Sequence, residues 1–557
     1  MKKFFILFIL LTFALFSAAA CGSKDNNATG TLENQTDEKV NMPVETATES
    51  AREKPMPPER PLPSASSSAI PDTIEDFSYY LDERIPKEVR DIVIENRRHL
   101  FVNTNPEIIE NPGKYMALDY DEAIDDYIVE TLKNADNIPL ENTRLSFETI
   151  EKDLDFLFAY LKYSYGAYQY YGGDEVFLPM KETILAELKD KNGNRVYSNV
   201  YADTLYKHIS EAIIDCHFAI GNESLAKTQS HRYFVYSTDY FFDLKEDVFC
   251  TEIDGLDYEL ISIDGLAPID LMKPYLNAEG FMVWVAGYPS KKGLSKDFRP
   301  IVLYNEETGK VIETEIFLIS HFSNGTNTGP MYNEYELNGI SIVESRTCTP
   351  SPDAGDMFKV MSDAAVALKD KNIIVVDLRD NGGGNTGYPR AWLSGLLDTN
   401  FDNMRGVYAQ RRTKTTYHIH GQRWGRSLEE FLATDSHKSW AGPSIDAAKA
   451  YENKDRVFIV LADNNTGSSG EGFVDYLRQI ENTIVFGTNT GGAFSTGNIA
   501  AINLPYSKIR IQCGHALHLE PDLTTIEGIG IQPDIWVPSK DSLERVVKFI
   551  ENYGLSQ

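Results

Sequence analysis

The sequence predicts a multi-domain α/β protein with a buried sheet in its C-terminal half. Two runs there, Ile373–Leu378 and Val457–Ala462, are apolar without interruption and alternate with helical patterns. Such runs are typical of strands that are covered on both faces. Two further observations place other structure upstream, because apolar residues first recur at helical spacing and then fall into short β runs.

The N-terminus has the pattern of a secretory signal over residues 1–20. Two lysines precede the uncharged apolar run Phe4–Phe16, and small residues follow at Ser17–Ala20. The run is too short to span a membrane, and a signal of this kind is removed. Cys21 comes directly after the small residues, which resembles a bacterial lipobox and implies lipidation of Cys21. The alternative is an ordinary cleaved signal with a cysteine nearby.

Residues 21–75 are expected to form a disordered tether behind the lipid anchor. No aromatic residue occurs between Gly22 and Asp76, and Pro, Ser, Thr, Glu and Asn dominate. Such a segment buries too little apolar surface to offset its ordering entropy. The whole chain has a formal net charge of −30, which argues against nucleic acid as a partner and against direct binding to anionic lipid.

The rest of the chain is long enough for two or three domains. We expect a mainly helical region over residues 76–220, a β-rich insert over 221–338 and an α/β core over 339–557. The best-defined elements are helices at 153–161, 206–214, 357–368 and 472–480, and strands at 258–263, 311–318, 340–344, 373–378, 457–462 and 483–486.

Cysteines and histidines give no sign of a metal site. The four cysteines beyond Cys21 are scattered, without a CxxC pair, and the sequence does not assign disulfides. Two histidine pairs, His418 with His420 and His515 with His518, lack the HExxH pattern and an evident third ligand. We interpret them as strand or loop residues and expect no metal or other cofactor.

A serine lies in the turn between a buried strand and a helix. Val457–Ala462 leads into a polar segment that contains Gly467, Ser468 and Ser469, and a helix follows. A hydroxyl placed there faces the free N–H groups and the positive dipole of a helix start, which can stabilise an oxyanion. The alternative role for either serine is to cap the helix. The turn is not a GxSxG nucleophile elbow, because Gly467, Ser469 and Glu471 occupy the three fixed positions and the final glycine is missing.

Three glycines follow the strand at 373–378. Gly382, Gly383 and Gly384 allow the backbone to approach a ligand closely. With Gly387 they also satisfy GxGxxG, the dinucleotide fingerprint. Three polar residues separate the strand from these glycines, Pro389 follows soon after, and no βαβ unit opens the chain, so the dinucleotide interpretation is rejected.

Four separated segments together resemble motifs of the tail-specific, or C-terminal-processing, protease family, which also contains the tricorn core protease and retinoid-binding-protein-like repeats. In chain order they are Ile214–Phe218, Val376–Gly384, Gly467–Glu471 and Ile526–Asp534. The resemblance covers about residues 150–540. It implies a crotonase-like ββα-type peptidase core, a PDZ-like insert at 221–338 and a polypeptide substrate.

The resemblance also assigns catalytic roles. Ser468 stands three residues before a glutamate, as the family nucleophile does, but Ala493 occupies the place of the lysine that many members use as the base. The chain is therefore similar to the branch in which a histidine and a glutamate complete a triad. His217 is then the general base and Glu527 the acid that orients it, with Glu520 as a rival carboxylate.

The same resemblance places an oxyanion hole at the backbone N–H of Ser469 and that of Gly383 or Gly384. Alternative roles for the other residues are a core histidine for His217 and a turn residue for Glu527. Glu471 and Asp475 are expected to favour the helix N-terminus electrostatically rather than to take part in chemistry.

These expectations add up to an extracellular, membrane-tethered serine endopeptidase. It would cleave extended or unfolded polypeptides through an acyl-enzyme, without a cofactor. The main alternative is a non-catalytic ligand- or peptide-binding lipoprotein on the same fold, and a weaker one is an esterase or amidase. Retention of Ser468, His217 and Glu527 together favours the peptidase. The sequence does not predict the oligomeric state.

Overall fold

The computed structural model confirms the predicted mixed α/β fold. It describes residues 77–101, 114–134, 143–192, 194–227, 229–294, 297–325, 328–353, 355–401, 407–420, 425–433, 440–441, 450–520 and 523–556. The predicted signal, Cys21 and the tether lie outside these residues. Among the helices that are described, none combines the length and the apolar character that crossing a membrane requires.

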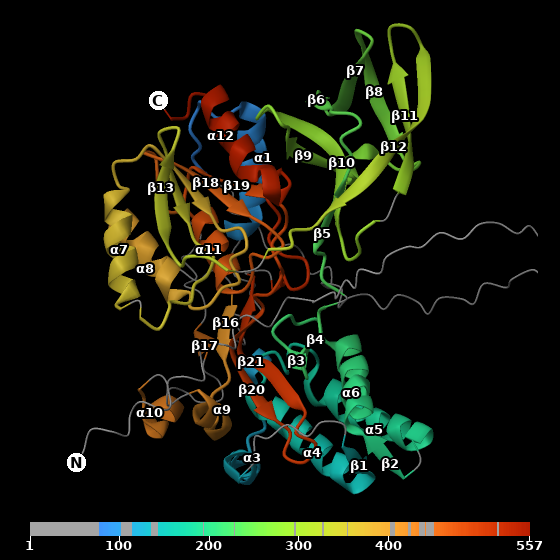
Figure 1. The fold of residues 1–557 in the computed structure, drawn as a ribbon, viewed down its shortest axis with the longest axis vertical. Helices are drawn as coiled ribbons and strands as arrows, with labels where there is room; N and C mark the ends of the chain where they lie inside the picture. The colour runs from blue at the N-terminus through green and yellow to red at the C-terminus, as the bar shows by residue number, and fades with distance from the viewer. Residues whose placement is uncertain are drawn as a thin grey trace, which may run out of the picture.

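A parallel sheet at the centre of the upper lobe carries the candidate chemistry (Figure 1). Its strands pair in the order β14 (Ile340–Glu344), β15 (Ile373–Asp377), β18 (Val457–Ala462), β19 (Thr483–Gly487) and β22 (Ile535–Trp536). All four pairings are parallel. Strands β15, β18 and β19 are buried along their whole length. This burial is the reason for their uninterrupted apolar sequences.

Helices cover both faces of this sheet. One face packs on α7 (Met357–Ala367), α8 (Gly387–Leu397) and α11 (Ser469–Arg478), and the other on α1 (Lys87–Arg98) and α12 (Ser542–Asn552). Alternate residues of one strand serve the two cores: Ile374 and Val376 face α7, α8 and α11, whereas Ile373 and Val375 face α1 and α12.

The β insert continues the core sheet instead of forming a sheet of its own. Strand β22 pairs with β9 in parallel at Trp536 and Tyr275, and β13 extends the opposite edge beside β14, which gives fourteen strands in all. The strands of the insert are β5 (Tyr233–Tyr236), β6 (Asp243–Lys245), β7 (Val248–Ile253), β8 (Leu256–Ile263), β9 (Met272–Leu276), β10 (Met282–Ser290), β11 (Asp297–Asn305), β12 (Lys310–His321) and β13 (Asn333–Leu337). The end of the insert formed by β7, β8, β11 and β12 projects away from the core in Figure 1.

The lower lobe combines N-terminal helices with C-terminal strands (Figure 1). The helices are α3 (Glu122–Asn134), α4 (Phe147–Ser164), α5 (Gly173–Asn192), α6 (Ser198–Ala212), α9 (Lys414–Ile419) and α10 (Leu428–Ala433). The strands are β1 (Arg144–Ser146), β2 (Arg195–Tyr197), β3 (Ala219–Ile220), β4 (Glu223–Ser224), β16 (Val407–Gln410), β17 (Trp440–Ala441), β20 (Thr496–Asn503) and β21 (Arg510–Leu519). The β21 residues Ile511 and Leu517 share one core with Phe156 of α4 and Tyr201 of α6.

The three predicted folded regions, 76–220, 221–338 and 339–557, stay a prediction, and the packing crosses their boundaries. Helix α1 from the first region packs on the core sheet of the third, and β20 and β21 from the third pack on the helices of the first. Local periodicity indicates that an element is amphipathic but does not say which partner covers its apolar face.

A buried ion pair fixes α1 to the sheet. Arg97 donates two hydrogen bonds to Asp534, at 2.8 and 2.7 Å, and both side chains are 1% exposed. The same carboxylate accepts the backbone N–H of Val485 in β19 at 2.8 Å. Asp534 therefore joins a helix near the start of the described chain to the central sheet.

Replacing Asp534 by Asn should lower the free energy of unfolding by about 3–5 kcal/mol, because Arg97 would stay buried without its full counter-charge. Urea unfolding measures the loss. The control is Asp363→Asn, because the ion pair of Asp363 with Lys359 is largely exposed and its loss should leave the unfolding free energy nearly unchanged. Equal losses in the two variants would contradict this account of Asp534.

Candidate active site

Ser468 occupies a strained turn between β18 and α11. Its backbone has φ 54° and ψ −124°, a conformation that costs a residue other than glycine on the order of 1–3 kcal/mol. The Ser468 N–H donates to Oε2 of Glu471 at 3.0 Å. The serine is partly exposed, whereas Ser469 and Glu471 are buried. The turn thus holds one serine at the protein surface in a fixed, unusual conformation.

The glycine segment after β15 lies against this turn. A Cβ added to Gly383 would come within 2.7 Å of the Ser468 Cβ and 2.8 Å of the Ser469 nitrogen, and Gly383 has φ +89°. The Gly467 N–H donates to the carbonyl of Asn381 at 2.9 Å. Only glycine permits so close an approach in this conformation, so the structure brings the two predicted loops together.

The three N–H groups predicted for the oxyanion hole differ in availability. The Gly383 N–H donates to Oδ1 of Asn381 at 2.9 Å. The N–H groups of Ser469 and Gly384 make no hydrogen bond to another described residue. Ser469 follows Ser468 directly and occupies the first position of α11.

His217 lies in the segment after α6 and is 7% exposed. Its backbone N–H donates to Asp215 at 2.8 Å. The imidazole interacts with the backbone of Thr496, and its buried Nδ1 has no partner within the described part of the chain. Burial lowers the pKa of His217 below 6.5, with the carboxylate of Asp215 acting in the opposite direction, so the ring is neutral near pH 7.

Glu527 binds backbone groups on both sides of the site. Its Oε1 accepts the N–H of Cys216 at 2.5 Å, and its Oε2 accepts those of Phe494 and Ser495 at 3.1 and 2.8 Å. Burial raises the pKa of Glu527, and nearby Asp215 raises it further. Both Glu527 and His217 are described, and no hydrogen bond joins the carboxylate to the imidazole. Glu527 instead holds the residue before His217.

Glu471 makes more contacts than its predicted electrostatic role requires. Its carboxylate is fully buried and accepts four hydrogen bonds, from the N–H groups of Ser468, Gly492 and Ala493 and from the hydroxyl of Thr490. The S-x-x-E spacing of a capping box is a sequence signal for the first of these bonds. The other three donors lie about twenty residues further along, so no local pattern predicts them.

A second polar network lies at the ends of β14 and β15. Arg346 and Arg379 both donate to the carboxylate of Asp377, which is fully buried. Burial alone would raise the pKa of Asp377, but the bonds from Arg379 and Arg346 lower it to about 2. The network fixes the segment that leads to Gly383.

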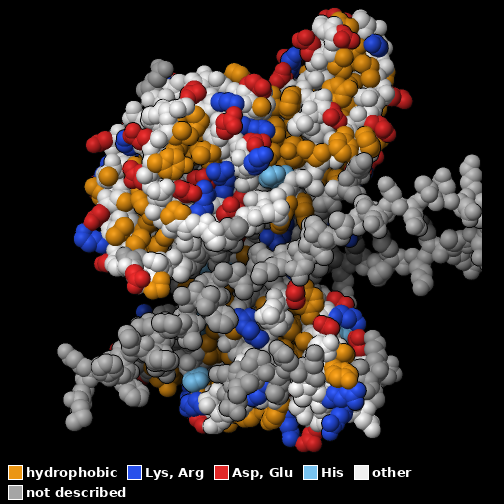
Figure 2. Space-filling model, in the orientation of Figure 1, with side chains coloured by type: hydrophobic (Ala, Val, Ile, Leu, Met, Phe, Trp, Pro, Cys, Tyr) orange, Lys and Arg blue, Asp and Glu red, His pale blue; other side chains and the backbone are white. Residues whose placement is uncertain are grey.

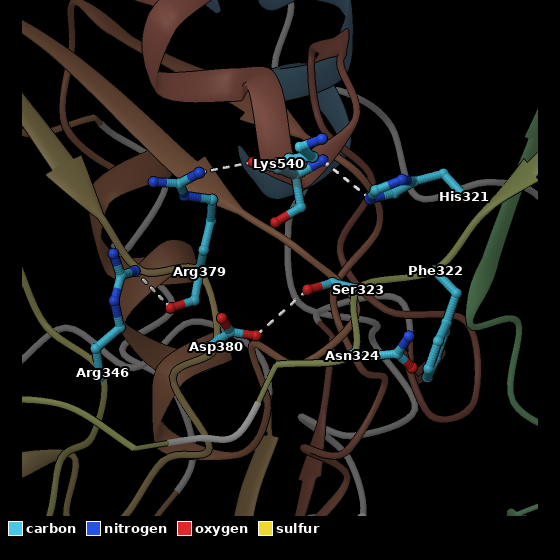
Figure 3. Close-up of a pocket in the computed structure, with 9 residues that line it drawn as sticks. His321, Phe322, Ser323, Asn324, Arg346, Arg379, Asp380 and Lys540 are labelled. Atoms are coloured by element: carbon cyan, nitrogen blue, oxygen red, sulfur yellow. Dashed lines mark hydrogen bonds between the residues drawn. The ribbon is translucent and has the colours of Figure 1, made fainter. Parts of the chain in front are cut away.

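A cavity of about 370 Å³ opens beside this network (Figure 3). Asp380 lines it and accepts a bond from Asn465, in the loop that carries Ser468, at 2.8 Å, but Ser468 itself is not part of its wall. The lining residues are His321, Phe322, Ser323, Asn324, Arg346, Arg379, Asp380, Ser539 and Lys540. Asp377 pairs with both arginines, and Glu344 pairs with Arg346 as well. The lining also holds Lys540 and Asp380, and Asp380 lies beside Arg379 in Figure 3, so positive and negative charges are mixed around the cavity.

Neither the surface view nor the histidines indicate another kind of site. Acidic and basic side chains are mixed over both lobes in Figure 2. Among the described residues, no group of three His, Cys, Asp or Glu is placed to hold a metal. The rings of His420 and His515 lie 4.8 Å apart. His418 belongs to helix α9, where the sequence suggested a strand or loop.

Comparison with known proteins shows a similarity to one family. Residues 348–537, about a third of the chain, match the model of peptidase family S41. The matched span contains Ser468, Glu527 and the glycine segment, and it confirms the family that the motifs predict. No curated protein sequence matches the chain.

Several solved structures are similar to the chain. Mature CPAF complexed with lactacystin has 13% identity, with 73% of this chain and 99% of that chain covered and a TM-score of 0.39. The photosystem II D1 C-terminal processing protease has 13% identity, 72% and 97% coverage and a TM-score of 0.33. The tricorn protease has 12% identity, 73% and 37% coverage and a TM-score of 0.29.

The Asp377 network makes stability depend on acid pH. The folded-state pKa of about 2 lies below the ordinary 3.8, so the ionised carboxylate stabilises the fold above about pH 4 and this contribution disappears as pH falls through about 2. The shift corresponds to about 2 kcal/mol. The difference in unfolding free energy between wild type and Asp377→Asn should shrink by about that amount from neutral to strongly acid pH. A difference independent of pH would contradict this assignment.

Proposed function

We propose that this chain is a serine endopeptidase that cleaves extended or unfolded polypeptides through an acyl-enzyme on Ser468. The observation that carries the proposal is the turn at Ser468. The serine is partly exposed and strained, the Ser469 N–H beside it is not engaged, and the backbone of Gly383 packs against it. A helix cap needs neither the strain nor the glycine contact.

The chemistry follows from these groups. The Ser468 hydroxyl oxygen attacks the scissile carbonyl carbon while neutral His217 accepts its proton, and the Ser469 N–H stabilises the oxyanion. The C–N bond then breaks as the imidazolium protonates the leaving amine, and water releases the acyl group by the same route. A lysine base is absent at position 493: the Ala493 methyl lies 3.9 Å from where a Cβ on Gly467 would be.

We also propose that the enzyme works outside the cytoplasm, at the surface of the cell membrane. Support comes from the signal-like residues 1–20, the lipobox-like cysteine at Cys21 and the polar tether of residues 21–75. A lipid on Cys21 would anchor the chain, and the tether would hold the folded part away from the bilayer. The PDZ-like insert would shape access to the site, and any peptide that it binds would add as a strand.

One observation favours a second candidate, a non-catalytic binding lipoprotein on the same fold. The oxygens of Glu527 accept backbone N–H groups, and the buried Nδ1 of His217 has no partner among the described residues. The bond that would orient the imidazole is therefore not made in this conformation. If the chain is a peptidase, the side chain of His217 or of Glu527 must move when substrate binds, so that this hydrogen bond forms.

A fluorophosphonate probe separates the two candidates. The peptidase should form an adduct on Ser468, located by peptide mass spectrometry, that disappears in Ser468→Ala. Labelling should slow by about 100-fold or more in His217→Ala, because the hydroxyl loses its base. His208→Ala is the matched control, since that ring contacts Glu187 on the lower-lobe helices. A folded wild type without adduct favours the binding protein.

The pH dependence of labelling tests His217 as the base. Because burial lowers its pKa below 6.5, the imidazole stays neutral and able to accept a proton at pH 6.5 and for some distance below it. The labelling rate should therefore be flat near neutral pH and fall with a midpoint below 6.5. A midpoint above 6.5 would contradict this account. It would show either that another group controls the rate or that the pKa of His217 is raised and not lowered.

A further inference from the structure

Four consecutive backbone N–H groups are divided between two buried carboxylates. Gly492 and Ala493 donate to Glu471 at 2.7 and 2.8 Å. Phe494 and Ser495 donate to Glu527 at 3.1 and 2.8 Å. Residues 492–495, called the spacer below, therefore connect the two glutamates through the backbone alone.

Each glutamate also holds one half of the candidate site. Glu471 accepts the N–H of Ser468 at 3.0 Å, and Glu527 accepts the N–H of Cys216, the residue before His217, at 2.5 Å. The Sγ of Cys216 in turn lies 3.1 Å from the carbonyl of Gly492. Nucleophile turn, spacer and histidine segment thus form one connected unit.

The donors around Glu471 require an ionised carboxylate. Three N–H groups and the Thr490 hydroxyl, at 2.6 Å, point at its two oxygens, and the side chain has no exposed surface. A carboxylate is the one side-chain group of this shape that only accepts hydrogen bonds. An amide would place its own N–H groups against these donors and leave buried groups unsatisfied.

We propose that Glu471 is a positioning residue for the nucleophile. It holds the Ser468 N–H, so the turn keeps its strained conformation and the neighbouring Ser469 N–H is left for the oxyanion. Through the spacer it also fixes how far the nucleophile turn lies from the histidine segment. A simple helix cap accounts for one of its four bonds, whereas three donors come from residues 490–493. The inference rests on the proposed function.

The test is the Glu471→Gln variant, measured as saturable labelling of the full chain by the fluorophosphonate probe. The maximal labelling rate reports alignment of the reacting groups, and the half-saturating probe concentration reports binding. The matched control is Glu481→Gln. Glu481 is also buried and accepts backbone N–H groups, from Tyr80 and Asn453, both at 3.3 Å, but it makes no bond to the spacer. The melting temperature of each variant is measured in parallel.

We expect the maximal rate of Glu471→Gln to fall by about 100-fold, the usual effect of disturbing an oxyanion hole, with half-saturation within about threefold of wild type. Glu481→Gln should lose stability but keep its rate. Should Glu471→Gln fail to fold, Thr490→Val removes one donor, and Thr490→Ser is its control. The valine variant should label several-fold more slowly than the serine variant, which keeps the hydroxyl.

Two results would overturn the inference while leaving the proposed function intact. One is a folded Glu471→Gln variant that is labelled as fast as Glu481→Gln. If Glu471→Gln does not fold, the corresponding result is a Thr490→Val variant that is labelled as fast as Thr490→Ser. The other is an equal loss of rate in Glu471→Gln and Glu481→Gln, which would make the effect one of general stability. A folded wild type that the probe does not label would overturn the proposed function, and the inference with it.

Discussion

The hydrogen bond between the Ser468 N–H and the buried carboxylate of Glu471 is the contact on which the rest of the site depends. A buried charge is costly unless hydrogen bonds replace its water, and here four donors do so. Meeting that requirement brings residues 490–493 to the nucleophile turn. Those residues in turn lie against the Gly528–Gly530 segment, next to Glu527. The hydrogen bonds of the Glu471 carboxylate therefore link the nucleophile turn to residues 490–493, and through them to the Gly528–Gly530 segment.

The central sheet explains why these loops meet. Parallel strands end at the same edge, and functional groups of α/β proteins gather outside the carboxyl ends of such strands. The loops after β15 and β18 supply Gly383 and Ser468, and the Asp377 network at the end of β15 fixes the first of them. The β insert shares the same hydrogen-bonded sheet through β22 and β9. The strained turn at Ser468 thus follows a strand of the sheet that the core and the insert share.

Much of the fold could be predicted from the sequence because strand patterns are local. The strands predicted at 340–344 and 457–462 have those bounds, and four spaced motifs gave the family. The packing of β20 and β21 on the N-terminal helices could not be predicted, because the sequence of an amphipathic strand does not indicate which element covers its apolar face. The triad of Ser468, His217 and Glu527 stays a prediction. The donors from residues 490–493 to Glu471 were missed because they are distant from it in sequence.

A crystal structure of the fluorophosphonate adduct tests the central claim most directly. The account predicts phosphonyl density on Ser468, with the phosphonyl oxygen about 3 Å from the Ser469 nitrogen and the Ser468 N–H still bonded to Glu471. The imidazole of His217 should by then face the Ser468 oxygen. An adduct whose phosphonyl oxygen points away from Ser469, or whose Ser468 N–H has left Glu471, would contradict it.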